Sequence, residues 1–214
     1  MVMTPYERAR GKAYAETFRC PGGELCLDFC NTGQEARDKP GEEWLSSYAD
    51  VVDWLEIAGG ITRKHAATLR EAAARAPEAA QKVWRRAIAL REALATVLLA
   101  KVAGRKPAEE NLRLIEQEYA RTAPCARLVP GDSGFSWSVD RESDELDSAL
   151  RPVLDSAVAL MTSERMRRVR RCGNATCYWL FVDETKNCSR RWCEMASCGN
   201  VMKVRRHRER HRAA

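Results

Sequence analysis

The chain has 214 residues, enough for one large domain or a medium domain with a small module, and its 45% hydrophobic and 31% charged residues exclude a disordered or fibrous protein. The net charge of +6 is unevenly distributed: residues 165–212 carry fourteen Lys or Arg and four acids, whereas the remainder carries 22 bases and 26 acids. A basic end on a mildly acidic body is typical of a module that binds a polyanion, and nucleic acid is the leading candidate.

The sequence also bears on the compartment. No apolar run is long enough to span a bilayer, and residues 1–10 lack the apolar core of a secretory signal. We therefore expect a cytoplasmic protein with no membrane partner. Nine cysteines are present, five of them within residues 172–198, and in a reducing compartment such a cluster favours metal binding over disulfide bonds.

Apolar and polar side chains alternate over residues 24–30, which is the period of a half-buried strand, so we predict a short strand there. Asp28, Asn31 and Thr32 lie at its end, where they either line a pocket for a small-molecule effector or cap a turn. Cys26 and Cys30 share one face of this strand. Ordinary packing is favoured for them over a redox role that would also involve Cys20.

Helical periodicity then dominates as far as residue 161. The expected helices cover residues 48–58, 63–76, 77–103, 107–119 and 143–161, with N-caps at Ser46-Ser47 and at Thr62 and a kink at Pro152. Residues 127–139, around a turn at 130–134, predict a β-hairpin. His65 lies among charged residues and is expected at the surface. The body is thus predicted to be an α+β domain, predominantly helical, with a short strand and a hairpin.

The cysteine cluster predicts a structural zinc site. Cys172 and Cys177 form one C-x4-C pair, Cys193 and Cys198 form a second, and fifteen residues separate the pairs. Tetrahedral zinc takes four such ligands from two tight turns. We expect a treble-clef-like finger: a knuckle, then a hairpin of residues 178–182 and 190–193, then a helix from residue 200, with Trp179, Phe181 and Trp192 as its small core.

Other uses of these residues stay open at this point. Cys188 and Cys193 also form a C-x4-C pair, and all of these cysteines could be ordinary buried residues. His207 and His211 lie four residues apart and could hold a second metal, although exposed helix residues are the simpler interpretation. The basic residues that could contact nucleic acid, rather than form a solvated tail, are Arg190, Arg191, Lys203, Arg205, Arg206 and Arg210.

Two stretches carry a family resemblance. The first comprises Cys172, Cys177, Phe181, Asp183, the run Arg190-Arg191-Trp192-Cys193-Glu194-Met195 and Cys198-Gly199-Asn200. The second comprises Leu25-Cys26-Leu27-Asp28-Phe29-Cys30-Asn31-Thr32, followed by Ala49-Asp50 and Val52-Asp53-Trp54-Leu55. The first resembles the CGNR zinc finger, and the second is similar to the start of the ABATE domain that precedes this finger. In one departure, Val201 stands where the motif has its final Arg.

The resemblance implies a stress-induced bacterial transcription regulator whose zinc finger binds DNA. We divide the chain into a helical regulatory domain of residues 1–163 and a finger of residues 164–214. The first is expected to fold independently, because its candidate core residues all precede the finger: Trp54, Trp84, Leu94, Leu98, Leu112 and Leu154. We expect one structural Zn²⁺ and no enzymatic activity, because no nucleophile with a base, phosphate loop or paired carboxylates is apparent. A protein- or RNA-binding adaptor remains the alternative function, and a homodimer remains open.

Overall fold

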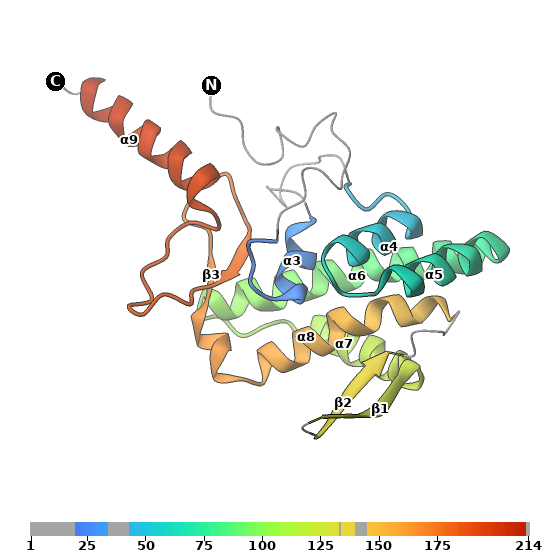
Figure 1. Ribbon diagram of the computed structural model, residues 1–214. Helices are drawn as coiled ribbons and strands as arrows, with labels where there is room; N and C mark the ends of the chain where they lie inside the picture. Colours follow the sequence, from blue (N-terminus) through green and yellow to red (C-terminus); the bar gives the residue numbers. More distant parts are fainter. Residues whose placement is uncertain (1–19, 34–42, 133, 140–144, 213–214) are drawn as a thin grey trace.

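A computed structural model describes residues 20–33, 43–132, 134–139 and 145–212 of the chain (Figure 1). The helices are α3 (Leu25–Asn31), α4 (Tyr48–Ile57), α5 (Arg63–Arg75), α6 (Pro77–Val102), α7 (Glu109–Arg121), α8 (Arg151–Met161) and α9 (Asn200–Arg212). The strands are β1 (Ala126–Gly131), β2 (Gly134–Val139), β3 (Val169–Arg171) and β4 (Leu180–Val182). Short 3-10 turns cover Ala123–Cys125, Leu146–Leu150 and Glu164–Arg168, and a π-helical turn covers Met195–Gly199. The predicted α+β class with mostly helical content is confirmed.

The predicted caps of α4 and α5 form, and of the pair Ser46-Ser47 it is Ser47 that caps α4. Ser47 Oγ accepts a hydrogen bond from the Asp50 N–H (3.2 Å), and Thr62 Oγ1 accepts one from the His65 N–H (3.2 Å). Pro77 is the first residue of α6, where a missing N–H breaks no helical hydrogen bond. These local signals therefore set where the helices of the body begin.

The strand predicted for residues 24–30 is wrong, because this segment forms the helix α3. Its side chains from Cys26 to Asn31 are all buried, since α3 packs against α6, α8 and β4. Alternation of apolar and polar residues identifies a strand only where one face meets solvent. In α3 the polar Asp28 and Asn31 are buried as well, because their side chains form hydrogen bonds inside the protein. The polar positions of the alternation therefore do not mark a face exposed to solvent.

Two further expectations for the body are corrected. Pro152 does not kink a helix, because residues 146–150 form a 3-10 turn and Pro152 lies in the first turn of α8; Ser143 lies outside the described residues. His65 is buried, and its Nε2 lies 3.0 Å from Ser148 Oγ, so it belongs to the packing between α5 and the 3-10 turn before α8.

The predicted hairpin of β1 and β2 is confirmed, with Leu128 opposite Trp137 and Pro130 opposite Phe135. It projects from the end of the molecule opposite to α9 (Figure 1). Leu128 and Phe135 are 55% and 74% exposed. None of the described helices is long and apolar enough to cross a membrane.

The finger has its own small sheet, but not the predicted one. β4 pairs antiparallel with β3, with Val169 opposite Val182, and residues 190–193 form no strand. The reason is local: Asp183 Oδ2 accepts a hydrogen bond from the Arg190 N–H (2.9 Å), which curls the chain after β4 into a loop. The returning segment therefore reaches the cysteine cluster without pairing along β4.

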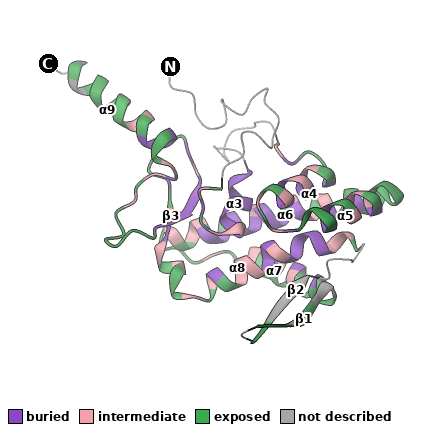
Figure 2. Cartoon of the chain, in the orientation of Figure 1, coloured by how far each residue is buried: buried purple, intermediate pink, exposed green. Residues whose placement is uncertain are grey.

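The hydrophobic core of the helical body includes side chains of the finger. Figure 2 shows its buried residues gathered in α3, α6 and α8. Val169, Leu180 and Val182, from β3 and β4, belong to the same cluster of buried side chains as the helices. The core of the helical body thus extends past residue 163.

Candidate metal centre and basic surface

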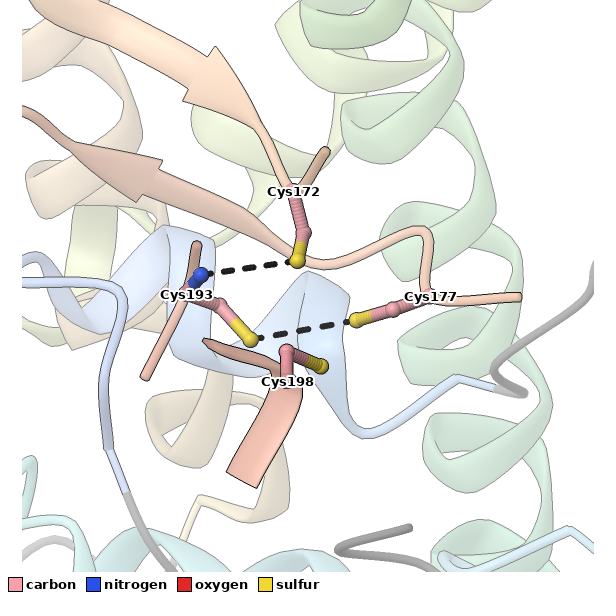
Figure 3. A group of neighbouring side chains, drawn as sticks. All are labelled: Cys172, Cys177, Cys193 and Cys198. Carbon is pink, nitrogen blue, oxygen red and sulfur yellow. Dashed lines mark hydrogen bonds between the residues drawn. The ribbon is translucent and has the colours of Figure 1, made fainter. Parts of the chain in front are cut away.

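Four cysteines from two separate turns meet in one buried cluster (Figure 3). Cys172 directly follows β3, and Cys177 closes the turn that leads to β4. Cys193 precedes the π-helical turn, and Cys198 lies within it. All four are buried, and their Sγ atoms lie within 4.8 Å of one another. The structure therefore brings together the four ligands expected from the sequence.

The sulfur spacing fits a tetrahedral zinc ion. With Zn–S bonds of about 2.3 Å, two sulfurs of a tetrahedron lie about 3.8 Å apart. Cys177 Sγ and Cys193 Sγ are 3.8 Å apart. The Cys193 N–H donates to Cys172 Sγ (3.5 Å) and Asn174 Nδ2 donates to Cys198 Sγ (3.5 Å), and such bonds orient ligands and favour the thiolate form. The donor set is that of one structural zinc.

Four thiols this close cannot all ionise without a cation. Contact with Cys177, and then with the other two cysteines, holds the pKa of the Cys172 thiol below its ordinary value, while contact with Cys172 raises the pKa of the Cys177 thiol. When zinc is bound, its charge stabilises all four thiolates together. The same ion cross-links the turn after β3 to the start of α9.

Aromatic side chains enclose the cluster, as the sequence predicts. Trp179 and Phe181 are buried against the cysteines, and Trp192 packs on them from the second turn. Gly173 is needed in the first turn, because an added Cβ would lie 3.0 Å from both the Arg191 carbonyl oxygen and the Trp192 ring. Because this cluster is so small, the two cysteine turns depend on the metal to stay together, whereas β3 and β4 also pack on the core of the body.

The fifth cysteine of this region does not join the cluster. Cys188 is exposed, has φ +48° and donates its N–H to the Thr185 carbonyl (3.2 Å) in the loop after β4. The alternative pair of Cys188 with Cys193 therefore finds no support in the geometry. In the body, Cys26 and Cys30 are buried in the core and Cys20 is exposed.

Arg190 is placed apart from the other basic residues expected to bind nucleic acid. Its guanidinium donates to the carbonyl oxygens of Pro21 (3.0 Å), Trp192 (3.1 Å) and Cys193, and it lies 4.4 Å from the centre of the Phe181 ring. Through these hydrogen bonds the guanidinium joins the finger to the segment before α3. Arg190 is thus a structural residue, which the sequence motif alone did not distinguish from Arg191.

The remaining basic residues form an exposed group on the finger. Lys203, Arg205 and Arg206 are exposed on α9, and Arg191 is exposed before it with its guanidinium 5.2 Å from the Trp192 ring centre. Arg210 is part of α9, but its side chain lies outside those described. Sequence reasoning missed two members: Arg208 on α9, and Arg171, which stacks 4.3 Å from the ring centre of Tyr178. The sequence did contain a signal for both, because Arg171 precedes the predicted ligand Cys172 and Arg208 lies between the predicted contacts Arg206 and Arg210.

The structure gives separate roles to the three residues expected to line a pocket or cap a turn: Thr32 is the C-cap of α3, and Asn31 lies where the body meets the finger. Asn31 Nδ2 donates to the Leu180 carbonyl (2.9 Å), and Asn31 Oδ1 accepts from the Leu180 N–H (2.8 Å), so the side chain pairs with β4 as a neighbouring strand would. Asp28 Oδ1 accepts from the Gly22 N–H (2.8 Å), and Thr32 Oγ1 donates to the Phe29 carbonyl (2.7 Å). These contacts are all within the protein.

A concave region lies elsewhere on the body. It has a volume of about 400 Å³ between the start of α4, the second half of α5 and the start of α6. Tyr48, Ala73, Ala80 and Trp84 give it a largely apolar lining, with Arg70 at its edge. Arg70 is already paired with Asp53 and Glu56, at 2.5 and 2.6 Å. No local sequence pattern indicates this pocket, because its lining comes from three separate helices.

Comparison with known families agrees with this arrangement. Residues 23–164 match the ABATE family, whose description reads "Putative stress-induced transcription regulator". The chain belongs to the ABATE family. Residues 168–211 match the CGNR zinc finger, so the two regions follow one another in the expected order, and both are regulator or zinc-finger families rather than enzyme families. A search of curated proteins found no match.

Proposed function

We propose that this ABATE protein is a DNA-binding transcription regulator that depends on zinc, with the helical region receiving a stress-linked signal and the finger contacting duplex DNA. The observation that carries the proposal is α9. It extends away from the rest of the described chain, and its side chains from Lys203 to Glu209 are all exposed (Figures 1 and 2). Its first turn joins directly to the cysteine cluster.

The dimensions and charge of α9 suit a major groove. An α-helix with its side chains is about 10–12 Å across, and the major groove of B-DNA is about 12 Å wide. A helix that enters the groove must be free of other contacts around most of its circumference, as α9 is. Its exposed lysine and arginines can neutralise phosphates, while the finger fixes the angle at which the helix leaves the body.

The test is binding of the zinc-loaded full-length protein to duplexes selected from a random pool, followed by anisotropy titrations over a range of salt concentrations. With about four to six phosphate contacts, the log–log slope of affinity against salt should be roughly −4 to −5. Absence of duplex binding at low salt, or a complex insensitive to salt, would contradict the proposal.

Position 201 bears on specificity. Val201 is half-buried at the first turn of α9, where the family motif has an arginine. Because base contacts specify sequence while phosphate contacts mainly position the protein, the missing arginine should reduce sequence preference more than bulk affinity. Val201→Arg should therefore sharpen the selected sequence motif. An unchanged motif would assign specificity elsewhere on the finger.

A protein-binding adaptor is the second candidate, and the hairpin supports it. Leu128 and Phe135 are strongly exposed on β1 and β2, at the end of the molecule remote from α9. Exposed apolar groups of this kind occur at protein interaction sites. If duplex binding fails, a pull-down with Leu128→Ser and Phe135→Ser as matched controls distinguishes this candidate from the first.

A further inference from the structure

The last turns of α9 place two imidazoles face to face. His207 and His211 are one helical turn apart, both are exposed, and their ring centroids are 4.4 Å apart. Their Nε2 atoms are 3.2 Å apart. At this distance one Nε2 can donate to the other, and the tautomers decide which ring donates. In the tautomers that carry the proton on Nδ1, both Nε2 atoms would offer a lone pair to one shared ligand.

We propose that His207 and His211 form a second metal site, which takes a divalent transition metal of the Ni²⁺, Cu²⁺ and Zn²⁺ class. With metal–nitrogen bonds of about 2.1 Å, nitrogens 3.2 Å apart subtend an angle of about 100° at the metal. This value lies between the octahedral and tetrahedral angles. Two histidines at i and i+4 on a helix are an established way to hold such metals, and water completes the coordination.

Ligand type and location set the character of this site. Nitrogen ligands select Ni²⁺, Cu²⁺ and Zn²⁺ over Mg²⁺ and Ca²⁺, which prefer oxygen. Two exposed ligands bind far less firmly than four buried thiolates, so the metal exchanges with solution while the zinc of the finger stays in place. Nothing in the proposal needs a change at the cysteine cluster.

Some of the surrounding charges oppose a cation at this site and others favour it. Arg206 and Arg208 flank His207 and oppose a cation, whereas the Arg205 charge is paired with Glu209 at 3.0 Å. The site also lies in the last turns of α9, where the negative end of the helix dipole favours a cation. Because phosphates would neutralise the arginines, duplex and metal should strengthen each other's binding by the same factor; this consequence alone rests on the proposed function.

The chain offers an internal control, because it contains three histidines and the third, His65, is buried against Ser148. In zinc-loaded full-length protein, the ring signals of all three can be followed by NMR during a Ni²⁺ titration. Paramagnetic Ni²⁺ should broaden the signals of His207 and His211 together at low occupancy and leave those of His65 sharp. Broadening of neither exposed ring, or of one alone, would overturn the proposal.

Affinity gives an independent readout by calorimetry with Ni²⁺, with zinc content measured before and after. Wild type should bind one Ni²⁺ per chain without losing zinc, and His211→Gln should bind at least about tenfold more weakly because one ligand is gone. Arg208→Gln is the matched control, since it changes a neighbouring exposed residue but no ligand, and it should bind at least as tightly as wild type. Equal affinity in wild type and His211→Gln, or Ni²⁺ uptake that only replaces zinc, would refute the site.

Discussion

At the scale of single residues, the four ligands and Cys188 provide a comparison within one small module. Cys198 points its sulfur into the cluster, while Cys188 lies exposed ten residues earlier. Cys198→Ser should lose bound zinc and unfold the finger, because a hydroxyl is a poor substitute for a thiolate ligand. Cys188→Ser should keep one zinc per chain. Elemental analysis and near-ultraviolet circular dichroism measure both outcomes; full zinc retention in Cys198→Ser would refute the assignment.

Asn31 gives the second prediction at this scale. Asn31→Ala removes both hydrogen bonds to Leu180 and leaves a backbone N–H and a C=O unpaired in the core. The expected loss is about 2–4 kcal/mol in the free energy of unfolding, measured in urea. Asn187, in the exposed loop after β4, is the control, and Asn187→Ala should be near neutral. Equal effects of the two substitutions would show that the pairing with β4 contributes no stability.

Asp28 gives a prediction for pH. Burial raises the pKa of its carboxyl to about 7. An unfolded aspartate ionises near pH 4, so between about pH 4 and 7 the folded state holds the proton more tightly and stability falls as the pH rises. In Asp28→Asn the amide oxygen can still accept from the Gly22 N–H. The substitution should raise the free energy of unfolding, and this gain should be about 2–3 kcal/mol larger at pH 8 than at pH 5. Urea unfolding at both pH values, with zinc content monitored, checks this; a gain independent of pH would exclude Asp28 as the cause.

At the scale of elements, the basic residues of α9 and of the loop before it have two different roles, the proposed contact with DNA and stabilisation of the finger. Arg206→Gln should reduce the magnitude of the salt slope for duplex binding by about one and leave stability unchanged, because the side chain is exposed and unpacked. Arg190→Gln should instead lower finger stability, since its guanidinium holds the carbonyls of Pro21 and Trp192. Anisotropy at several salt concentrations together with thermal unfolding distinguishes them. A slope unchanged by Arg206→Gln would remove this residue from the interface.

The elements that sequence predicts well are those governed by local chemistry. Ser47, Thr62 and Pro77 mark helix starts through groups a few residues away, and the paired cysteines specify the metal site through spacing. α3 and the loop of residues 183–193 are different. The conformation of α3 depends on β4, and Asp183 redirects the chain by binding the Arg190 N–H. The partner of α3 lies 149 residues away, beyond any local window. The Asp183 contact spans only seven residues, but an aspartate can accept from many backbone groups, so the sequence does not indicate which N–H it binds.

At the scale of the whole molecule, β3 and β4 tie the finger to the body. Val169, Leu180 and Val182 share the core of the helices, and the Val182 N–H donates to the Gly22 carbonyl (2.8 Å). A protein of residues 1–163 would leave apolar side chains of α3 and α6 uncovered. It should therefore unfold at a lower temperature than the full chain, by several degrees for each kcal/mol of lost packing.

Zinc removal tests the same connection without a truncation. Chelation should lower the unfolding temperature of the helices, followed by far-ultraviolet circular dichroism, because an unfolded finger withdraws β4 from α3. The unfolding temperature is compared with and without chelator in the Cys188→Ser protein, which keeps all four cysteine ligands. If chelation leaves the unfolding temperature of the helices unchanged, the body keeps its fold without the finger, as the predicted boundary at residue 163 implies.

The pairing of Asn31 with Leu180 also has a consequence for synthesis on the ribosome. The two residues are 149 positions apart, so α3 is made long before the strand it must bind. At about 5–20 residues per second, roughly 7–30 s pass before Leu180 is added. During that interval the buried polar groups of α3 have no β4 to pair with. The nascent helical body therefore cannot complete its core until β4 has been made, and the ligands Cys193 and Cys198 are added only after that.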